Sequence, residues 1–397
     1  MTPASHPIRR QIPGGVWALG FVSLLMDISS EMIHSLLPLF LATSLHAGAL
    51  SIGLIEGAAE ATALIVKVFS GVVSDYLGKR KALALIGYAL GAASKPLFAI
   101  AASSGMVLTA RLLDRVGKGI RGAPRDALIA DITPPEIRGA AFGLRQSLDT
   151  VGAFLGPLLA VGLMLLWNGD FRAIFLVAVI PGVLSVLVLL FGVREPAQTH
   201  NRHRGNPIHR DNLRRLPTAY WRIVAIGAVF TLARFSEAFL VLRAQQGAIP
   251  MALIPLVMVA MNLIYAASAY PFGKLSDRLD HRRLLSWGLW VLIAADAVLA
   301  SSSQWPMLLI GVGLWGVHMG MTQGLLAKLV ADTAPQDLLG TAFGFFNLVS
   351  GIALLLASVV AGWLWQQAGA SATFIAGAVF CLLTLLLMMP SVRSARR

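Results

Sequence analysis

Long apolar runs follow one another along almost the whole chain, and they constrain its fold more than any other feature. Each run is roughly 20 to 28 residues long, and at about 1.5 Å per helical residue this length crosses a hydrocarbon core about 30 Å thick. Because 57% of the 397 residues are hydrophobic and only 13% are charged, one water-soluble core cannot account for them. The sequence therefore predicts an all-α integral membrane protein with twelve transmembrane helices. The twelve runs are residues 16–43, 50–73, 82–102, 106–131, 139–167, 172–193, 220–243, 249–271, 284–302, 306–331, 339–367 and 371–390.

The positive charge is distributed unevenly between the two sides of the expected membrane. In the loops assigned to one side there are nineteen Lys and Arg residues, whereas the other side has two, Arg172 and Arg243. Cytoplasmic loops carry such an excess, so we expect both termini to be cytoplasmic. The basic stretch 194–219 is interpreted as a cytoplasmic linker near anionic lipid, between an N-terminal half (1–193) and a C-terminal half (220–397). With that interpretation, the net charge of +13 implies no nucleic-acid partner.

Several functional classes lack their signatures in this sequence. The single cysteine, Cys381, lies in the last apolar run, which excludes an intramolecular disulfide and a cysteine-based metal cluster. The sequence contains no nucleophile elbow, no phosphate-binding loop and no HExxH zinc motif. We therefore expect neither an enzyme nor a bound cofactor, and energy for any transport would come from an ion gradient. Residues 1–10 lack a cleavage pattern, so no removed signal peptide is expected.

Two segments recur about two hundred residues apart. Residues 71–81 (GVVSDYLGKRK) correspond to residues 273–283 (GKLSDRLDHRR), each between two apolar runs. Residues 131–143 correspond to residues 332–344 with an offset of 201. The chain is therefore a tandem duplication of a unit with six helices.

The repeated loop resembles the loop signature of the major facilitator superfamily, which lies between helices 2 and 3 and recurs between helices 8 and 9. The second copy departs from the signature at Asp280, where a glycine is usual. The resemblance implies two pseudo-symmetric six-helix bundles with a site at their interface near the bilayer midplane. It also implies a conformational latch, in which Asp75 caps helix 11 and Lys79 or Arg80 pairs with Asp131. The alternative is that these surface charges only determine the topology of the protein in the membrane. The residues assigned to the latch are Gly71, Asp75, Gly78, Lys79, Arg80, Asp131, Gly273, Asp277 and Asp332.

Helix 5 carries a second motif, Gly143, Gly152 and Gly156-Pro157. It resembles the motif of the superfamily's proton-coupled antiporters, although the closing glycine pair of that motif is Ala160-Val161 here. Small residues allow close helix approach and proline can kink a helix, so ordinary membrane-helix packing is the alternative explanation.

Ionisable residues inside the spans concentrate in the first half and form stripes on four helices. A charge at a lipid-facing position is costly, so these stripes are expected to face a polar interior. The second half offers only Arg234, Glu237, His318 and Lys328. The stripes of the first half are Asp27, Glu31 and His34; Glu56, Glu60 and Lys67; Asp114, Lys118, Arg121 and Arg125; and Arg145 with Asp149.

We expect Asp27 and Glu31 to carry protons or cations, because burial and neighbouring cations compete in setting how readily a membrane carboxyl ionises. Glu60 and His34 are the next candidates. Arg115, three residues before Lys118, resembles the family's arginine motif on helix 4. Ion pairs that only fix the bundle are expected for Arg145 with Asp149 and for Arg125 with Asp126. The complete set of coupling candidates is Asp27, Glu31, His34, Glu56, Glu60, Asp114, Arg115, Lys118, Arg145, Asp149 and Glu237.

The leading functional prediction is a monomeric, proton-coupled secondary transporter of the inner membrane that exports a small organic compound by alternating access. A metal-ion or metal-chelate transporter is the alternative, with Asp27, Glu31 and His34 as ligands. A membrane sensor without transport activity is a third possibility, which a flux measurement would distinguish. Aromatic and methionine residues expected to form an apolar wall are Phe235, Met258, Tyr265, Trp315, Met319, Phe345 and Phe346.

Overall fold

The computed structural model describes residues 12–77, 79–195, 213–247, 249–276, 278–301, 304–322 and 324–389, apart from the side chains of Val72, Asp75, Leu77 and Asp337. Every regular element in these ranges is a helix, which confirms the all-α prediction. The first half contains α1 (Gly14–His34), α2 (Leu37–Thr43), α3 (Ala49–Leu77), α4 (Arg80–Ile100), α5 (Ser104–Ile132), η1 (Pro135–Ile137), α6 (Arg138–Leu166), α7 (Phe171–Val177) and α8 (Val179–Gly192). The second half contains α10 (Thr218–Ala233), α11 (Ala238–Gln246), η2 (Met251–Leu253), α12 (Leu256–Ser276), α13 (His281–Ser301), α14 (Trp305–Thr322), α15 (Leu325–Thr333), η3 (Gln336–Leu338), α16 (Leu339–Ala368) and α17 (Ala370–Met388).

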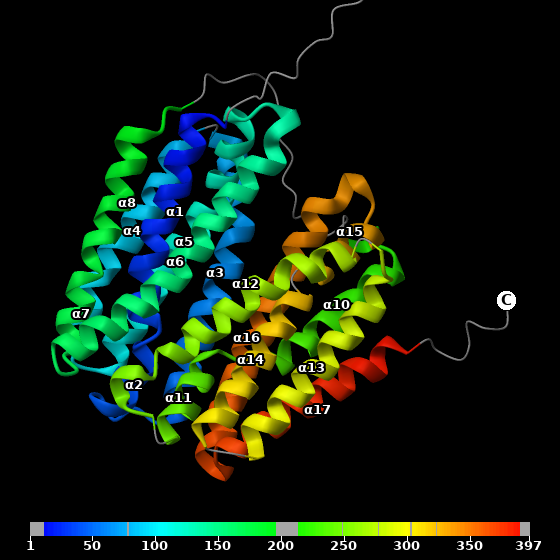
Figure 1. Ribbon diagram of the computed structural model, residues 1–397. Helices are drawn as coiled ribbons and strands as arrows, with labels where there is room; N and C mark the ends of the chain where they lie inside the picture. Colours follow the sequence, from blue (N-terminus) through cyan, green and yellow to red (C-terminus); the bar gives the residue numbers. More distant parts are fainter. Residues whose placement is uncertain are drawn as a thin grey trace, which may run out of the picture.

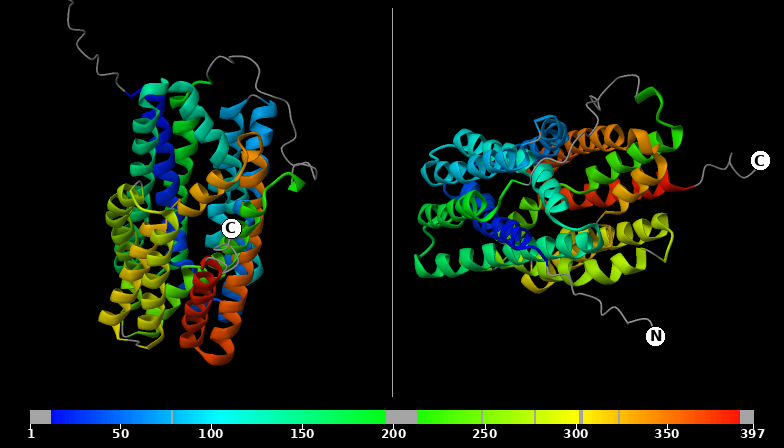
Figure 2. Two further views of the ribbon diagram at one scale, coloured as in Figure 1. Left: turned by 90° about the vertical axis from the view of Figure 1, so that its right-hand side faces the viewer. Right: turned by 90° about the horizontal axis from the view of Figure 1, so that it is seen from above.

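The two halves of the chain form two groups of helices that lie next to each other (Figures 1 and 2). They meet where α3 lies against α16. A Cβ atom built on Gly362 would lie 2.8 Å from Leu50 Cα, and one built on Gly344 would lie 3.1 Å from Val68 Cγ1. Small residues thus let α3 and α16 approach closely at both ends of their contact. Most of the predicted linker, residues 196–212, is outside the described ranges.

Eleven segments of the described chain are long and apolar enough to cross a membrane, against the twelve apolar runs predicted. The exception is α5, which has 29 residues and is long enough to span. Its sequence contains Arg111, Asp114, Arg115, Lys118 and Arg121, so it is not an apolar helix. The prediction of twelve transmembrane helices therefore agrees with the structure, but the fourth of them is less apolar than predicted. Its charges are tolerated because they face other helices of the bundle.

Two of the predicted spans are broken at corresponding positions of the two halves. The span 16–43 consists of α1 and α2, interrupted at Ser35 and Leu36 just before Pro38. The span 220–243 consists of α10 and α11, separated by residues 234–237. Discontinuous helices of this kind leave backbone groups and side chains free to line a cavity inside a membrane protein.

Candidate functional site

Two adjoining cavities lie inside the molecule, and both are lined by residues of both halves. The central cavity has a volume of about 420 Å³, and the second cavity, the vestibule, has about 470 Å³. Both are lined by Glu31, Glu60 and Lys118, so the two spaces adjoin at these side chains. The vestibule also contacts Ser23 and Lys67, so it extends toward the end of the molecule at which α1 begins and α3 ends. A space of this size accommodates a small organic molecule.

The backbone and Cβ atoms of α1 at Asp27 and Glu31 lie against two glycines of the motif on α6. A Cβ atom built on Gly152 would lie 2.9 Å from Asp27 Cβ, and one built on Gly156 would lie 2.7 Å from Glu31 Cβ. Only glycine allows this approach, because a methyl group at either position would overlap α1. Gly143, by contrast, has nothing within 4 Å of its Cβ position. Helix α6 continues through Pro157 without interruption.

The two acids of α3 that line the central cavity are paired with arginines of α5. Arg111 Nε donates to Glu56 Oε1 at 3.1 Å, and its Nη2 donates to the other oxygen of the same carboxylate at 2.5 Å. Arg115 Nη2 lies 2.8 Å from Glu60 Oε1. The bidentate pair and the neighbouring pair neutralise the two acids of α3. Arg111 is not among the candidates from the sequence, although a charged residue inside a predicted span indicates a polar interior position.

His34 connects the cavity to a buried ion pair. Its Nδ1 lies 3.6 Å from Glu31 Oε1 and 3.4 Å from Arg115 Nη2, and its Nε2 lies 3.4 Å from Asp114 Oδ2. Asp114 is paired with Lys95 of α4, whose Nζ lies 2.8 Å from Asp114 Oδ1. Asp114 therefore contacts Lys95 and His34 and does not line either cavity. Lys95 was missed in the sequence, where it is a lone charge in the third apolar run.

The metal alternative has little support in this geometry. Both ring nitrogens of His34 face charged groups of α1 and α5, so neither is free to bind a metal without rearrangement. Among the described residues, no three His, Cys, Asp or Glu side chains converge as a metal site would require.

A further ionic cluster lies beside the vestibule, which is lined by its members Arg125, Asp126 and Asp149. Arg145 Nη1 lies 3.1 Å from Asp149 Oδ2 and 3.6 Å from Asp126 Oδ1, and Arg125 Nη2 lies 3.1 Å from the same Asp126 oxygen. The guanidinium of Arg121 lies 4.9 Å from the ring centroid of Tyr88. Asp27 also lines the vestibule, yet within the described chain it forms no ion pair and no hydrogen bond through its carboxylate.

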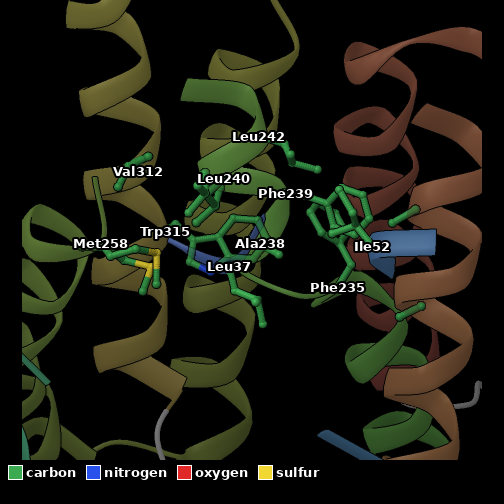
Figure 3. Packing of buried hydrophobic residues seen from close by; sticks show 14 of the residues in the cluster. Leu37, Ile52, Phe235, Ala238, Phe239, Leu240, Leu242, Met258, Val312 and Trp315 are labelled. Carbon is green, nitrogen blue, oxygen red and sulfur yellow. The ribbon is translucent and has the colours of Figure 1, made fainter. Parts of the chain in front are cut away.

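The second half contributes an aromatic wall and two charges to the central cavity. Arg234 and Glu237 lie in the break between α10 and α11. The expected wall is present in part: Phe235, Met258, Trp315 and Phe346 line the central cavity and Tyr265 lines the vestibule, but Met319 and Phe345 line neither. Figure 3 shows Phe235, Met258 and Trp315 within the hydrophobic packing.

The second half has more ionisable residues within its spans than the four predicted, because Asp296 lies inside α13. Its side chain is fully buried, and neither carboxylate oxygen has a hydrogen-bond partner in the described chain. A Cβ atom built on Gly377 would lie 2.6 Å from Asp296 Oδ2. His318 is also fully buried, with Nδ1 2.8 Å from Gly288 O, and lines neither cavity.

The latch candidates are described in part. Arg80 is paired with Asp131, the contact implied by the loop resemblance. Lys79 and Asp332 are exposed, a Cβ atom on Gly71 would lie 3.6 Å from Ala123 Cβ, and Gly273 has open space around it. The side chain of Asp75 and the residues Gly78 and Asp277 lie outside the described part of the chain. Whether these residues bias a conformational change stays a prediction.

Comparisons with known proteins agree with this architecture. The chain is 34% identical to MJ1317 of Methanocaldococcus jannaschii, an uncharacterized MFS-type transporter, over 386 residues that cover 96% of this chain and 95% of the relative. It is 24% identical over 387 residues to the multidrug resistance protein MdtH of Photorhabdus laumondii, covering 89% and 87% of the two chains. A crystal structure of a bacterial homologue of the human lysosomal transporter Spinster, inward-facing and unoccupied, superposes with a TM-score of 0.74 at 15% identity, covering 94% of this chain and 95% of that one.

The family model of the Major Facilitator Superfamily matches residues 19–251 and 238–396, which together span almost the whole described molecule. The two matches overlap at residues 238–251, a stretch that includes α11. This multi-pass membrane protein belongs to the Major Facilitator Superfamily of transporters.

Proposed function

We propose that this transporter is a proton-coupled antiporter of the inner membrane that exports a small organic compound by alternating access. Both termini would face the cytoplasm, and the vestibule would open toward that side. The proton gradient would supply the energy without a bound cofactor, and one chain would be the transporting unit.

One observation carries the proposal: among the described acids of α1, α3 and α5 that line the cavities or adjoin them, the two on α1 form no ion pair with a lysine or arginine. Glu56 and Glu60 are held by arginines and Asp114 by a lysine. Asp27 forms no ion pair in the described chain, and the ion-pair partner of Glu31 is a histidine. A carboxylate without a fixed cation is the one that can gain and lose a proton during a transport cycle.

The close contact of α1 with α6 supports coupling between proton binding and movement. Gly152 and Gly156 hold α6 directly against Asp27 and Glu31. A change of charge on these carboxylates would therefore change the interaction between α1 and α6, two helices that both line the vestibule. The name of MdtH, a multidrug resistance protein, supports export as the direction.

The test is flux in proteoliposomes with an imposed pH gradient, using a panel of radiolabelled organic cations, anions and zwitterions. For any compound that the wild type transports, Glu31→Gln should abolish gradient-driven flux while compound binding persists. Asp27→Asn should weaken the dependence of flux on pH. Glu136→Gln is the matched control, because Glu136 is an exposed acid of η1 outside both cavities.

Gradient-driven flux that survives unchanged in both carboxylate variants would remove α1 from the coupling mechanism. Divalent-ion binding that is lost in Glu31→Gln and His34→Ala alike, with flux insensitive to the proton gradient, would replace the proposal by metal transport. Binding without flux of any compound would indicate a sensor.

A further inference from the structure

Some of the charged side chains that line the central cavity form ion pairs with one another, and others do not. Glu56 and Glu60 are paired with Arg111 and Arg115. The other charged lining residues, apart from Glu31 with its histidine partner, are Lys118, Arg234 and Glu237. Within the described chain, none of these three side chains forms an ion pair or a hydrogen bond.

The unpaired charges are of both signs and come from both halves of the molecule. Lys118 is on α5 in the first half, whereas Arg234 and Glu237 are in the break of the seventh span in the second half. The break is tied to α16, because the backbone N–H of Ser236 donates to Ser358 Oγ at 3.2 Å. Arg234 and Glu237 thus both line the cavity from one short segment, three residues apart, and a hydrogen bond to the neighbouring helix α16 holds that segment in place.

The wall beside these charges is aromatic. Phe235 packs against Trp315 with their ring centroids 5.4 Å apart, and both line the cavity together with Phe230 and Phe346. Trp315 Nε1 is buried and has no hydrogen-bond partner in the described chain. A tryptophan N–H in this situation is available to an acceptor on a bound molecule.

From this arrangement we propose that the transported compound is amphoteric: a ring-containing molecule that carries an anionic and a cationic group. Its anionic group would bind between Lys118 and Arg234, its cationic group would bind Glu237, and its ring would pack on Phe235 and Trp315. The inference rests on the proposed function, in which the central cavity is the substrate site.

The reason is electrostatic. Charged groups inside a membrane protein are costly unless they are compensated. An organic cation would satisfy Glu237 but add to the positive charge of Lys118 and Arg234, and an organic anion would leave Glu237 without a partner. A molecule with both charges gives each of the three groups an oppositely charged neighbour, and discrimination against the others follows from the groups that they leave unpaired.

Binding to detergent-purified protein without any gradient tests the substrate class separately from transport. The probes are matched quartets, each built on one aromatic amino acid or dipeptide: the free zwitterion, its methyl ester (cation), its N-acetyl derivative (anion) and its N-acetyl methyl ester (neutral). Affinity is measured by equilibrium dialysis of radiolabelled probes. The zwitterion should bind about 10-fold more tightly than any other member, because each charge-assisted contact adds affinity of that order.

The variants assign the two charges. Arg234→Gln should weaken binding of the zwitterion and the N-acetyl member about 10-fold and should not weaken binding of the methyl ester. Glu237→Gln should weaken binding of the zwitterion and the methyl ester about 10-fold and should not weaken binding of the N-acetyl member. Arg222→Gln is the matched control, since Arg222 is on the same helix as Phe230 but donates to Met389 O at 2.8 Å, away from the cavity. If no quartet shows a preference for the zwitterion, including the case in which no member binds, the amphoteric assignment is wrong, while proton-coupled flux of another compound would still uphold the proposed function.

Discussion

Gly156 of α6 lies so close to Glu31 of α1 that a Cβ atom at position 156 would be 2.7 Å from the Glu31 Cβ. That separation is well inside normal contact distance, so the absence of a side chain at Gly156 is what allows the carboxylate helix and α6 to touch. The glycine motif and the acid stripe, separate features of the sequence, are therefore two sides of one helix contact.

Gly156→Ala should force these helices apart. We expect a lower thermal unfolding midpoint, corresponding to about 1 to 3 kcal/mol of overpacking, and a marked loss of gradient-driven flux. Gly162→Ala is the matched control on the same helix, because nothing lies within 4 Å of its Cβ position. Alanine favours a helix more than glycine does, so the control should be neutral or slightly stabilising. Equal effects of the two substitutions would show that the contact with α1 is not the cause.

The pair of Lys95 and Asp114 should be structural, because both side chains are essentially inaccessible to solvent. Lys95→Met leaves Asp114 with His34 as its remaining ion-pair partner, and breaking a buried pair in this way costs about 3 to 5 kcal/mol. The double variant Lys95→Met/Asp114→Leu should recover most of that loss. Thermal unfolding in detergent measures both, with Lys274→Met at the exposed end of α12 as control. A double variant as unstable as Lys95→Met alone would show that the pair itself is not what matters.

The positions of the helices and of their charged stripes could be predicted from the sequence, because helix length and the helical period determine both. The α5 stripe is an example: Asp114, Lys118 and Arg121 face the bundle as expected. The partners of the charges could not be predicted, since they depend on how neighbouring helices rotate and tilt. Asp114 was grouped with the coupling residues, but the structure pairs it with Lys95, a residue of another helix.

The break in the seventh span also had no signal in the sequence. Residues 234–237 read Arg-Phe-Ser-Glu and contain neither glycine nor proline, the usual markers of a helix interruption. The break is recognisable only from the fold, where Ser236 is bonded to Ser358 of α16. In contrast, the break before α15 coincides with Gly324, whose φ of 74° is a conformation that glycine adopts readily.

The contact of Arg80 with Asp131 should affect transport more than folding. Asp131 is partly exposed, and an exposed ion pair contributes only about 0.2 to 1 kcal/mol to stability. Asp131→Asn should therefore leave expression and the unfolding midpoint nearly unchanged, and lower the flux because one conformational state loses its bias; Asp75→Asn should behave in the same way. Asp280→Asn, in the repeated loop of the second half, is the control. Wild-type flux in Asp131→Asn at normal expression would rule out the latch.

His34 should be required for coupling because it lies between a cavity carboxylate, Glu31, and the buried Asp114, with Arg115 beside it. Histidine can bind and release a proton near neutral pH, whereas glutamine can only form hydrogen bonds. His34→Gln should therefore lower gradient-driven flux about 10-fold or more, the order expected for a lost proton-transfer group. Substrate exchange without a gradient should persist, because the hydrogen-bonding capacity of the position is retained.

The matched control for His34 is His318→Gln. His318 is equally a membrane histidine, but it is fully buried against Gly288 and lines neither cavity. Its substitution should lower stability but leave unchanged the ratio of gradient-driven flux to exchange, which is the quantity that reports coupling. The measurement is this ratio for both variants in proteoliposomes at several pH values. An unchanged ratio in His34→Gln would show that protons reach Glu31 without the histidine, and the path would then run from the vestibule through Asp27.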